Sequence, residues 1–205
     1  MPRIQDTLID VLQIVRHNLD AAIDQLAPAP GDFVVLSNIA FAENPTLKTP
    51  GVQDKVVITL VKTEEESALK NQPAYHRNPV SNSLEYRNPP IFLNLYLLIT
   101  ANYSDYLIAL TQLSRVIGYF QHKRVFTDTD AEVQLPPGSP VVHFDFNVTL
   151  VSPSFEQTNH LWSILGGKHL PSVLYKMQVV QMEYVPDTAQ AAPLIETIQM
   201  QEKIY

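Results

Sequence analysis

Two segments of this chain are apolar at both odd and even positions. They are residues 56–61 (VVITLV) and residues 91–99 (IFLNLYLLI). Because successive side chains of a strand point to opposite faces, such a pattern predicts strands that lie centrally in a sheet or are covered on both faces. The rest of the chain must therefore supply the elements that cover this sheet.

Apolar residues at helical spacing predict two long amphipathic helices. In the first, the apolar positions are Ile4, Leu8, Leu12, Val15, Leu19, Ile23 and Leu26. This helix is expected to end at Pro28 and the Pro30-Gly31 pair. In the second, the apolar positions are Tyr106, Leu110, Leu113, Ile117 and Phe120. We expect Ser104 or Asn102 to cap its N-terminus.

A third helix is predicted from its two ends. It begins with a capping box, in which the side chains of Ser154 and Gln157 can satisfy two backbone donors. Gly166 suits the left-handed position that follows many helices. The apolar positions between these ends are Phe155, Trp162 and Leu165. We expect Trp162 to lie in the core.

Alternating patterns predict further strands. The apolar positions are Val142, Phe144, Phe146, Val148 and Leu150 in one, and Val173, Tyr175, Met177 and Val179 in another. A short strand is expected at residues 33–37, and polar loops at 67–88 and 127–140. The order of elements is typical of an α+β fold, with a mixed β-sheet and about three packed helices. Residues 1–185 would form this domain, and residues 186–205 a linker and a C-terminal arm that adds to a neighbouring sheet.

Composition limits the class of protein. A chain of 205 residues can form one domain with its own core. The absence of cysteine excludes disulfides and zinc–thiolate sites. A net charge of −7 argues against a general nucleic-acid surface, which needs clustered Lys and Arg. No uninterrupted apolar segment suits a signal peptide or a membrane span, so we expect no membrane partner.

Two motifs could suggest chemistry, but each has a simpler explanation. His143 and Asp145 would share one face of a strand, yet a third metal ligand is missing, and a half-exposed strand shows the same pattern. Gly166-Gly167-Lys168 closes a helix, whereas a phosphate-binding loop opens one. We interpret the first as surface patterning and the second as a helix stop.

The consecutive carboxylates of Glu64, Glu65 and Glu66 are typical of a solvated strand end, although they could also contact a charged partner. The six histidines form no zinc-binding motif, and no nucleophile elbow is present. We therefore predict no enzyme activity, no metal and no cofactor.

Three blocks of sequence are more specific than these patterns. They are residues 154–176 (SFEQTNHLWSILGGKHLPSVLYK), 87–126 (RNPPIFLNLYLLITANYSDYLIALTQLSRVIGYFQHKRVF) and 54–66 (DKVVITLVKTEEE). In their residues and in their order along the chain, these blocks resemble the tail-terminator or cap proteins of phage-tail-like contractile injection systems, of the antifeeding-prophage and virulence-cassette types. The resemblance spans about residues 4–183. It departs at Lys62, where the family carries Asn.

This resemblance implies a structural protein that forms a ring, expected to be hexameric, on the end of the inner tube opposite the baseplate. There it would end polymerisation of tube and sheath and fix the length of the particle. The implied partners are further copies of the chain, the inner tube protein and the sheath protein. The protein would assemble in the cytoplasm and become part of a particle that can be released from the cell.

Two alternatives stay open at this point. One is a baseplate or tube-joining component of the same particle, and the other is a small-ligand binding protein or enzyme that uses His143. The candidate assembly contacts lie in the expected loops, at strand ends and in the C-terminal arm. They are Glu64, Glu65, Glu66, His76, Arg77, Tyr86, Arg87, Lys168, His169, Ile198, Met200 and Ile204.

Overall fold

A six-stranded curled sheet forms the centre of the molecule. The computed structural model describes residues 7–42, 51–69, 75–78, 83–86, 91–138, 144–166, 168–182 and 191–192. The strands are β1 (Val34–Leu36), β2 (Lys55–Glu65), β5 (Ile91–Asn102), β6 (Val125–Thr127), β7 (Asp145–Val151) and β8 (Ser172–Met182). Their order is β1-β2-β5-β8-β7-β6. The β1–β2 pair is parallel and the other neighbouring pairs are antiparallel, so the expected mixed sheet is confirmed.

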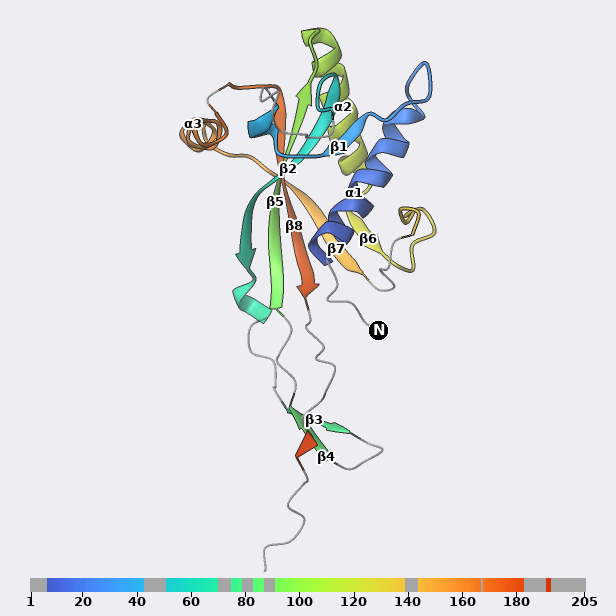
Figure 1. Ribbon diagram of the computed structural model, residues 1–205, viewed down its shortest axis with the longest axis vertical. Coiled ribbons are helices and arrows are strands. Elements are labelled where there is room, and N and C mark those ends of the chain that lie inside the picture. Colours follow the sequence, from blue (N-terminus) through green and yellow to red (C-terminus); the bar gives the residue numbers. More distant parts are fainter. Residues whose placement is uncertain are drawn as a thin grey trace, which may run out of the picture.

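Helices cover both faces of this sheet (Figure 1). The helix α1 (Thr7–Asp24) and the helix α2 (Tyr106–His122) pack on one face, where the larger hydrophobic cluster lies. The helix α3 (Phe155–Ile164) and the short 3-10 helix η1 (Ile39–Phe41) pack on the other face, around Trp162. The predicted α+β class is therefore confirmed, and the two segments with apolar residues on both faces are central strands.

A second, small sheet lies apart from the six-stranded one. It consists of β3 (Tyr75–Asn78), β4 (Ser83–Tyr86) and β9 (Ala191–Ala192), in the order β3-β4-β9. The expectation of a plain polar loop at 67–88 was therefore wrong, since that stretch contains a 3-10 helix, η2 (Ser67–Leu69), and a hairpin. Within the stretch expected to be a linker, β9 pairs with β4 of the same chain.

Two helix ends differ from the expectation. The helix α1 ends at Asp24, and Leu26, expected on its apolar face, is exposed. The N-cap of α2 is Asp105, whose side chain accepts hydrogen bonds from the first turn of the helix. The expected cap Ser104 instead donates to the carboxylate of Asp54, which itself has a positive φ of 51°.

Two β-bulges interrupt the register of the long central strands. In the β2–β5 pair, Leu60 faces Leu97 but Lys62 faces Tyr96, so one extra residue lies in β2. A second irregularity lies between Leu93 and Leu95 in the β5–β8 pair. Bulges bend a strand and increase its twist, which accounts for the curl of the sheet.

A buried amide ties α1 to a loop far away in the sequence. The Asn18 side chain donates to the carbonyl of Gln134 at 2.7 Å and accepts from its N–H at 2.8 Å. It also donates to the carbonyl of Ile14 at 2.8 Å. Asn18 is buried and 116 residues from Gln134, so this contact holds the loop after β6 against the first helix.

Candidate assembly surfaces

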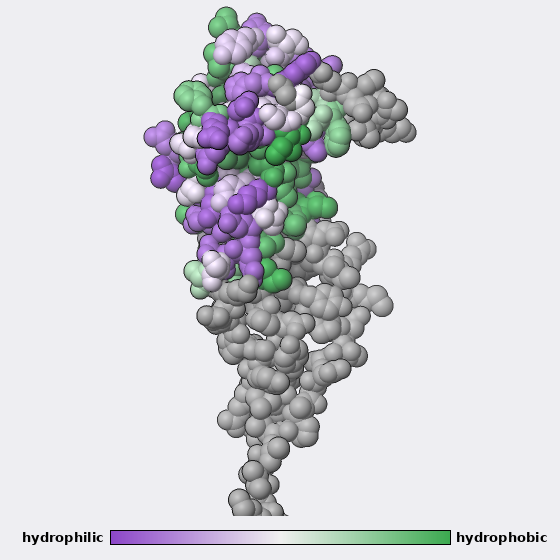
Figure 2. Space-filling view, turned by 90° about the vertical axis from the view of Figure 1, so that its left-hand side faces the viewer, coloured by the Kyte–Doolittle hydropathy of each residue, from purple (hydrophilic) through white to green (hydrophobic). Residues whose placement is uncertain are grey.

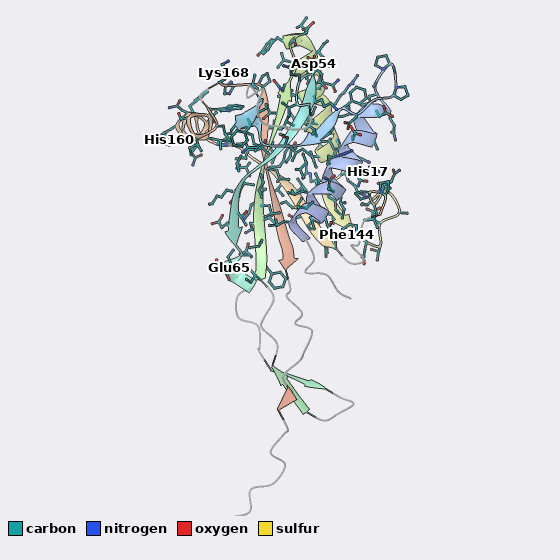
Figure 3. The ribbon with its side chains drawn as sticks, viewed as in Figure 1. His17, Asp54, Glu65, Phe144, His160 and Lys168 are labelled. Atoms are coloured by element: carbon teal, nitrogen blue, oxygen red, sulfur yellow. The ribbon has the colours of Figure 1, made fainter. Side chains whose placement is uncertain are left out.

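The predicted contact residues lie in separate regions of the molecule. In Figure 3, Glu65 lies at the far end of β2, and Lys168 lies beside α3 near the other end of the sheet. His76, Arg77 and Tyr86 belong to β3 and β4, whose side chains are not described. Arg87, Ile198, Met200 and Ile204 lie outside the described residues. The described candidates therefore do not form one site.

A polar network surrounds Glu64 where β2 leaves the covered part of the sheet. The Glu64 carboxylate accepts hydrogen bonds from the Tyr96 hydroxyl at 3.0 Å and from the Lys62 ammonium at 3.2 Å. These two bonds lower the pKa of Glu64. The ammonium groups of Lys62 and Lys176 lie 5.1 Å and 6.0 Å from the centre of the Tyr96 ring, within cation–π range. We call Lys62, Glu64, Tyr96 and Lys176 the polar sheet face.

Glu66 extends the polar network along β5 and to the backbone of η2. Its carboxylate accepts from the Asn94 amide at 2.9 Å and from the backbone N–H of Ala68 at 3.2 Å. These hydrogen bonds lower the pKa of Glu66. Glu64 and Glu66 therefore carry negative charge at neutral pH and have protein partners, so the end of β2 is ordered and charged. The described residues contain no group of three or more His, Asp or Glu that could hold a metal ion.

The other expected motifs are placed as follows. The helix α3 begins with the predicted capping box, and Gly166 has a φ of +105°, so the helix-stop interpretation of the glycine motif is confirmed. The His169 ring lies 5.4 Å from the Trp162 ring, which is buried as predicted. His143 lies outside the described residues, and Asp145 is exposed at the start of β7.

Only part of the apolar stripe predicted for α2 faces the core. The buried side of the helix is formed by Ala109, Gln112, Val116 and Phe120. Three of the predicted residues, Tyr106, Leu110 and Ile117, are exposed instead, with Tyr106 at 65%. Together with the half-buried Leu113, they form an exposed row along one side of α2. We call Tyr106, Leu110, Leu113 and Ile117 the α2 strip.

A groove of about 420 Å³ continues this strip between α2 and the sheet. Its lining residues are Ile117, Phe120, Gln121, Arg124, Val148, Thr149, Leu150 and Tyr175. Leu150, one of the apolar positions of the strand expected there, is 56% exposed at the rim of this groove, which we call the α2 groove. Burial raises the pKa of Tyr175 to about 12, so its hydroxyl stays neutral there.

Phe155, expected in the apolar stripe of α3, is also exposed. Phe155 precedes Trp162 by seven residues, or about two helical turns, so both point from the same side of α3. Trp162 is buried against the sheet, but Phe155 is 96% exposed. Figure 2 shows this side of the molecule, where hydrophilic and hydrophobic residues are interspersed. The first turn of α3 therefore lies beyond the part of the sheet against which the rest of the helix packs.

The sequence alone could not distinguish these exposed apolar residues from core. Both the α2 strip and Phe155 have the correct helical periodicity, and periodicity identifies an apolar face without saying what covers it. One signal was present: the run of residues 106–110 (YLIAL) places apolar residues all around the first turns of α2, more than one buried face requires.

Two solved structures share this fold over most of the chain. A cryo-EM structure of an extracellular contractile injection system, the PVC sheath/tube terminator in the extended state, matches with a TM-score of 0.60 and 18% sequence identity, over 98% of this chain and 65% of that one. The anti-feeding prophage cap, a tube-terminating cap, matches with a TM-score of 0.59 and 14% identity, over 95% of this chain and 61% of that one. This chain thus spans less than two thirds of the length of either.

The fold is thus shared with a sheath/tube terminator and a tube-terminating cap. The model of one family, described as the Pvc16 N-terminal domain, matches residues 10–196. The chain belongs to the Pvc16 N-terminal domain family. The resemblance based on the three sequence blocks is confirmed. A comparison with curated proteins found no match. Within the described ranges, no helix has the length and hydrophobicity needed to cross a bilayer.

Proposed function

We propose that this chain is a structural subunit that ends the inner tube and the last sheath layer of a contractile injection particle. The observation that supports this most strongly is the match of 98% of the chain to the fold of a sheath/tube terminator. Membership of the Pvc16 N-terminal domain family supports the same function. The second structural neighbour is a tube-terminating cap, which agrees with this role.

A terminator must bind the end of a polymer without recreating the surface to which the next polymer subunit would bind. This chain has two unlike surfaces that suit such a division. The α2 strip and α2 groove are largely apolar, as in the core of permanent interfaces. The polar sheet face is charged, and complementary charges across an interface select the partner and speed its association. We assign the apolar surface to contacts between copies, and the polar one to tube or sheath.

The predicted contact residues fit the second of these surfaces only in part. Glu64, Glu65 and Glu66 lie at the end of β2, next to the chain that leads into the β3–β4 hairpin. This end of the sheet would face the tube or sheath. Lys168 lies beside α3 (Figure 3), and the His169 ring lies against Trp162 of that helix. Both would contact a different neighbour. A homohexameric ring, assembly in the cytoplasm and a role for residues 187–205 as an arm are further parts of the proposal.

The location of the protein in the particle tests the proposal directly. An epitope-tagged chain is expressed in a strain that produces the particles, which are pelleted and labelled with gold for electron microscopy. We expect label at the end distal to the baseplate, and particles of irregular length when the chain is deleted. Complementation by the tagged chain should restore a uniform length.

The other outcomes separate the alternatives. Label at the spike end would favour a baseplate or tube-joining component. Tag confined to the soluble fraction, with normal particles in the pellet, would refute a structural role in the particle. A variant that lacks residues 187–205 and still attaches normally would eliminate the arm.

A further inference from the structure

The α2 groove and the first turn of α3 are complementary in shape and polarity. The α2 groove is a concave site with apolar walls from Ile117 and Leu150. Phe155 is a convex aromatic side chain that is almost fully exposed at the start of α3. Large apolar side chains that are exposed together as a patch are typical of interaction sites, and a few large side chains usually supply most of the binding energy there.

The two surfaces lie on opposite faces of the sheet within one subunit. Trp162 anchors α3 in the hydrophobic cluster on one face, whereas Phe120 and Tyr175, which line the groove, belong to the cluster on the other. Phe155 therefore cannot enter the groove of its own subunit without unpacking α3. The groove has room for a side chain that another molecule supplies.

The charges beside the groove and beside Phe155 indicate which molecule supplies this side chain. Arg124 lines the groove and is exposed, and it forms no ion pair with a carboxylate in the described ranges. Glu156, the neighbour of Phe155, is exposed and likewise has no cationic partner there. An incoming α3 would bring Glu156 close to Arg124 when Phe155 enters the groove. The pair would be partly desolvated, which favours recognition of this partner over others.

The lengths of the two surfaces also agree. The α2 strip runs from Tyr106 to Ile117, which corresponds to about 16 Å of helix, and the ten residues of α3 correspond to about 15 Å. Beside the groove, β6 pairs only with residues 145–147 of β7. In the described part of the chain no strand covers residues 149–151 on that side, so the approach to the groove is open.

We propose that α3 of a second copy of this chain docks along the α2 strip, with its Phe155 in the α2 groove and its Glu156 at Arg124. The contact joins two different surfaces, so its repetition closes a ring when the rotation between neighbouring copies divides a full turn, and gives an open filament otherwise. The inference rests on the proposed function in that it names the contact between copies in the terminator ring.

Cross-linking tests this contact, and the absence of cysteine from the chain removes its background. One variant carries Phe155→Cys and Leu150→Cys together, and two others carry a single change each. Particles are treated with a short bis-maleimide reagent, and the chain is detected by its tag. The double variant should give a ladder of dimers and larger species, whereas each single variant should stay monomeric. Both residues are exposed, so neither change should impair folding.

Substitutions also test the contact without a reagent. In co-expression with the tagged wild-type chain, Phe155→Ala should enter particles about 30-fold less efficiently, as expected for an aromatic residue at the centre of an interface. Leu26→Ala, which removes an exposed apolar side chain elsewhere, should be incorporated normally. Arg124→Glu and Glu156→Arg should each reduce incorporation, and the double charge reversal should restore most of it.

Each outcome supports or overturns the contact. Dimers from Phe155→Cys alone would indicate a symmetric α3–α3 contact and overturn it. Gold label at the distal end with no cross-link in the double variant would also overturn it, while leaving the proposed function in place. Loss of label from the particles would instead refute the proposed function. Incorporation of Phe155→Ala at the wild-type level would eliminate the role of that side chain.

Discussion

Thr59 provides a sharp test of how the α3 face of the sheet is held together. Its buried hydroxyl donates to the carbonyl of Ser37 at 2.8 Å and accepts from the N–H of Ile39 at 3.1 Å. These bonds fasten η1 to β2. In Thr59→Val a methyl group of similar size replaces the hydroxyl, so both backbone groups lose their partner and the packing stays nearly the same.

The expected loss follows from these contacts. A buried polar group left without a partner costs about 1–3 kcal/mol, less for the half-buried Ser37. The added methyl group returns about 0.8 kcal/mol through burial. We expect the free energy of unfolding of Thr59→Val to fall by about 2 kcal/mol. With a urea m-value of about 2–3 kcal/mol/M, the midpoint of unfolding should fall by about 0.7–1 M.

Thr100 is the matched control on the same face of the sheet. It is fully buried, and its hydroxyl has no hydrogen-bond partner in the described part of the chain. Thr100→Val therefore removes an unsatisfied polar atom and should leave stability unchanged or raise it by about 1 kcal/mol. Circular dichroism in urea measures both variants. Equal midpoint shifts for the two valine variants would refute the reasoning.

Two further predictions concern a pair of glycines and an ion pair. Gly166→Ala should destabilise the protein by about 1–2 kcal/mol because φ is +105° at this position. Gly118→Ala, in the middle of α2, should stabilise the protein by about 0.5–1 kcal/mol. Melting-temperature shifts of the same sign for the two variants would contradict this. The hydrogen bond from Lys123 lowers the pKa of Asp130. Its contribution is complete above the unfolded pKa of about 3.9 and is lost as the pH falls through the lower folded value. The melting-temperature gap between wild type and Asp130→Asn should therefore shrink below about pH 4, and parallel curves would show that the pair contributes nothing.

The parts of the fold that depend on local chemistry could be predicted from the sequence. The capping box of Ser154 and Gln157 and the left-handed Gly166 need only their own neighbours, and both are found as expected. The central strands could be predicted because both of their faces are apolar. The N-cap of α2 was missed because Asn102, Ser104 and Asp105 all offer a polar side chain close to the start of the helix. The contact of Ser104 with Asp54 decides between the last two.

The surfaces could not be predicted, because they depend on where the layers of the fold end. Phe155 and Leu150 are on the apolar phase of their elements, but the sheet and helices do not extend far enough to cover them. The hairpin at 75–86 was missed because its residues are polar and lie between prolines, without the alternation that indicates a half-buried strand. Stripes that are apolar in sequence and exposed in the structure are what a subunit of a larger assembly should show.

The amide contact between Asn18 and Gln134 has a consequence for how this subunit is completed. The N–H of Gln134 is protected from solvent only while α1 lies against the sheet, since its acceptor belongs to that helix. Bringing together two residues that are 116 positions apart costs conformational entropy, and such non-local contacts form slowly. The Gln134 amide should therefore gain protection late in folding. The protection of the Gln134 amide against hydrogen exchange therefore reports when α1 docks, independently of ring formation.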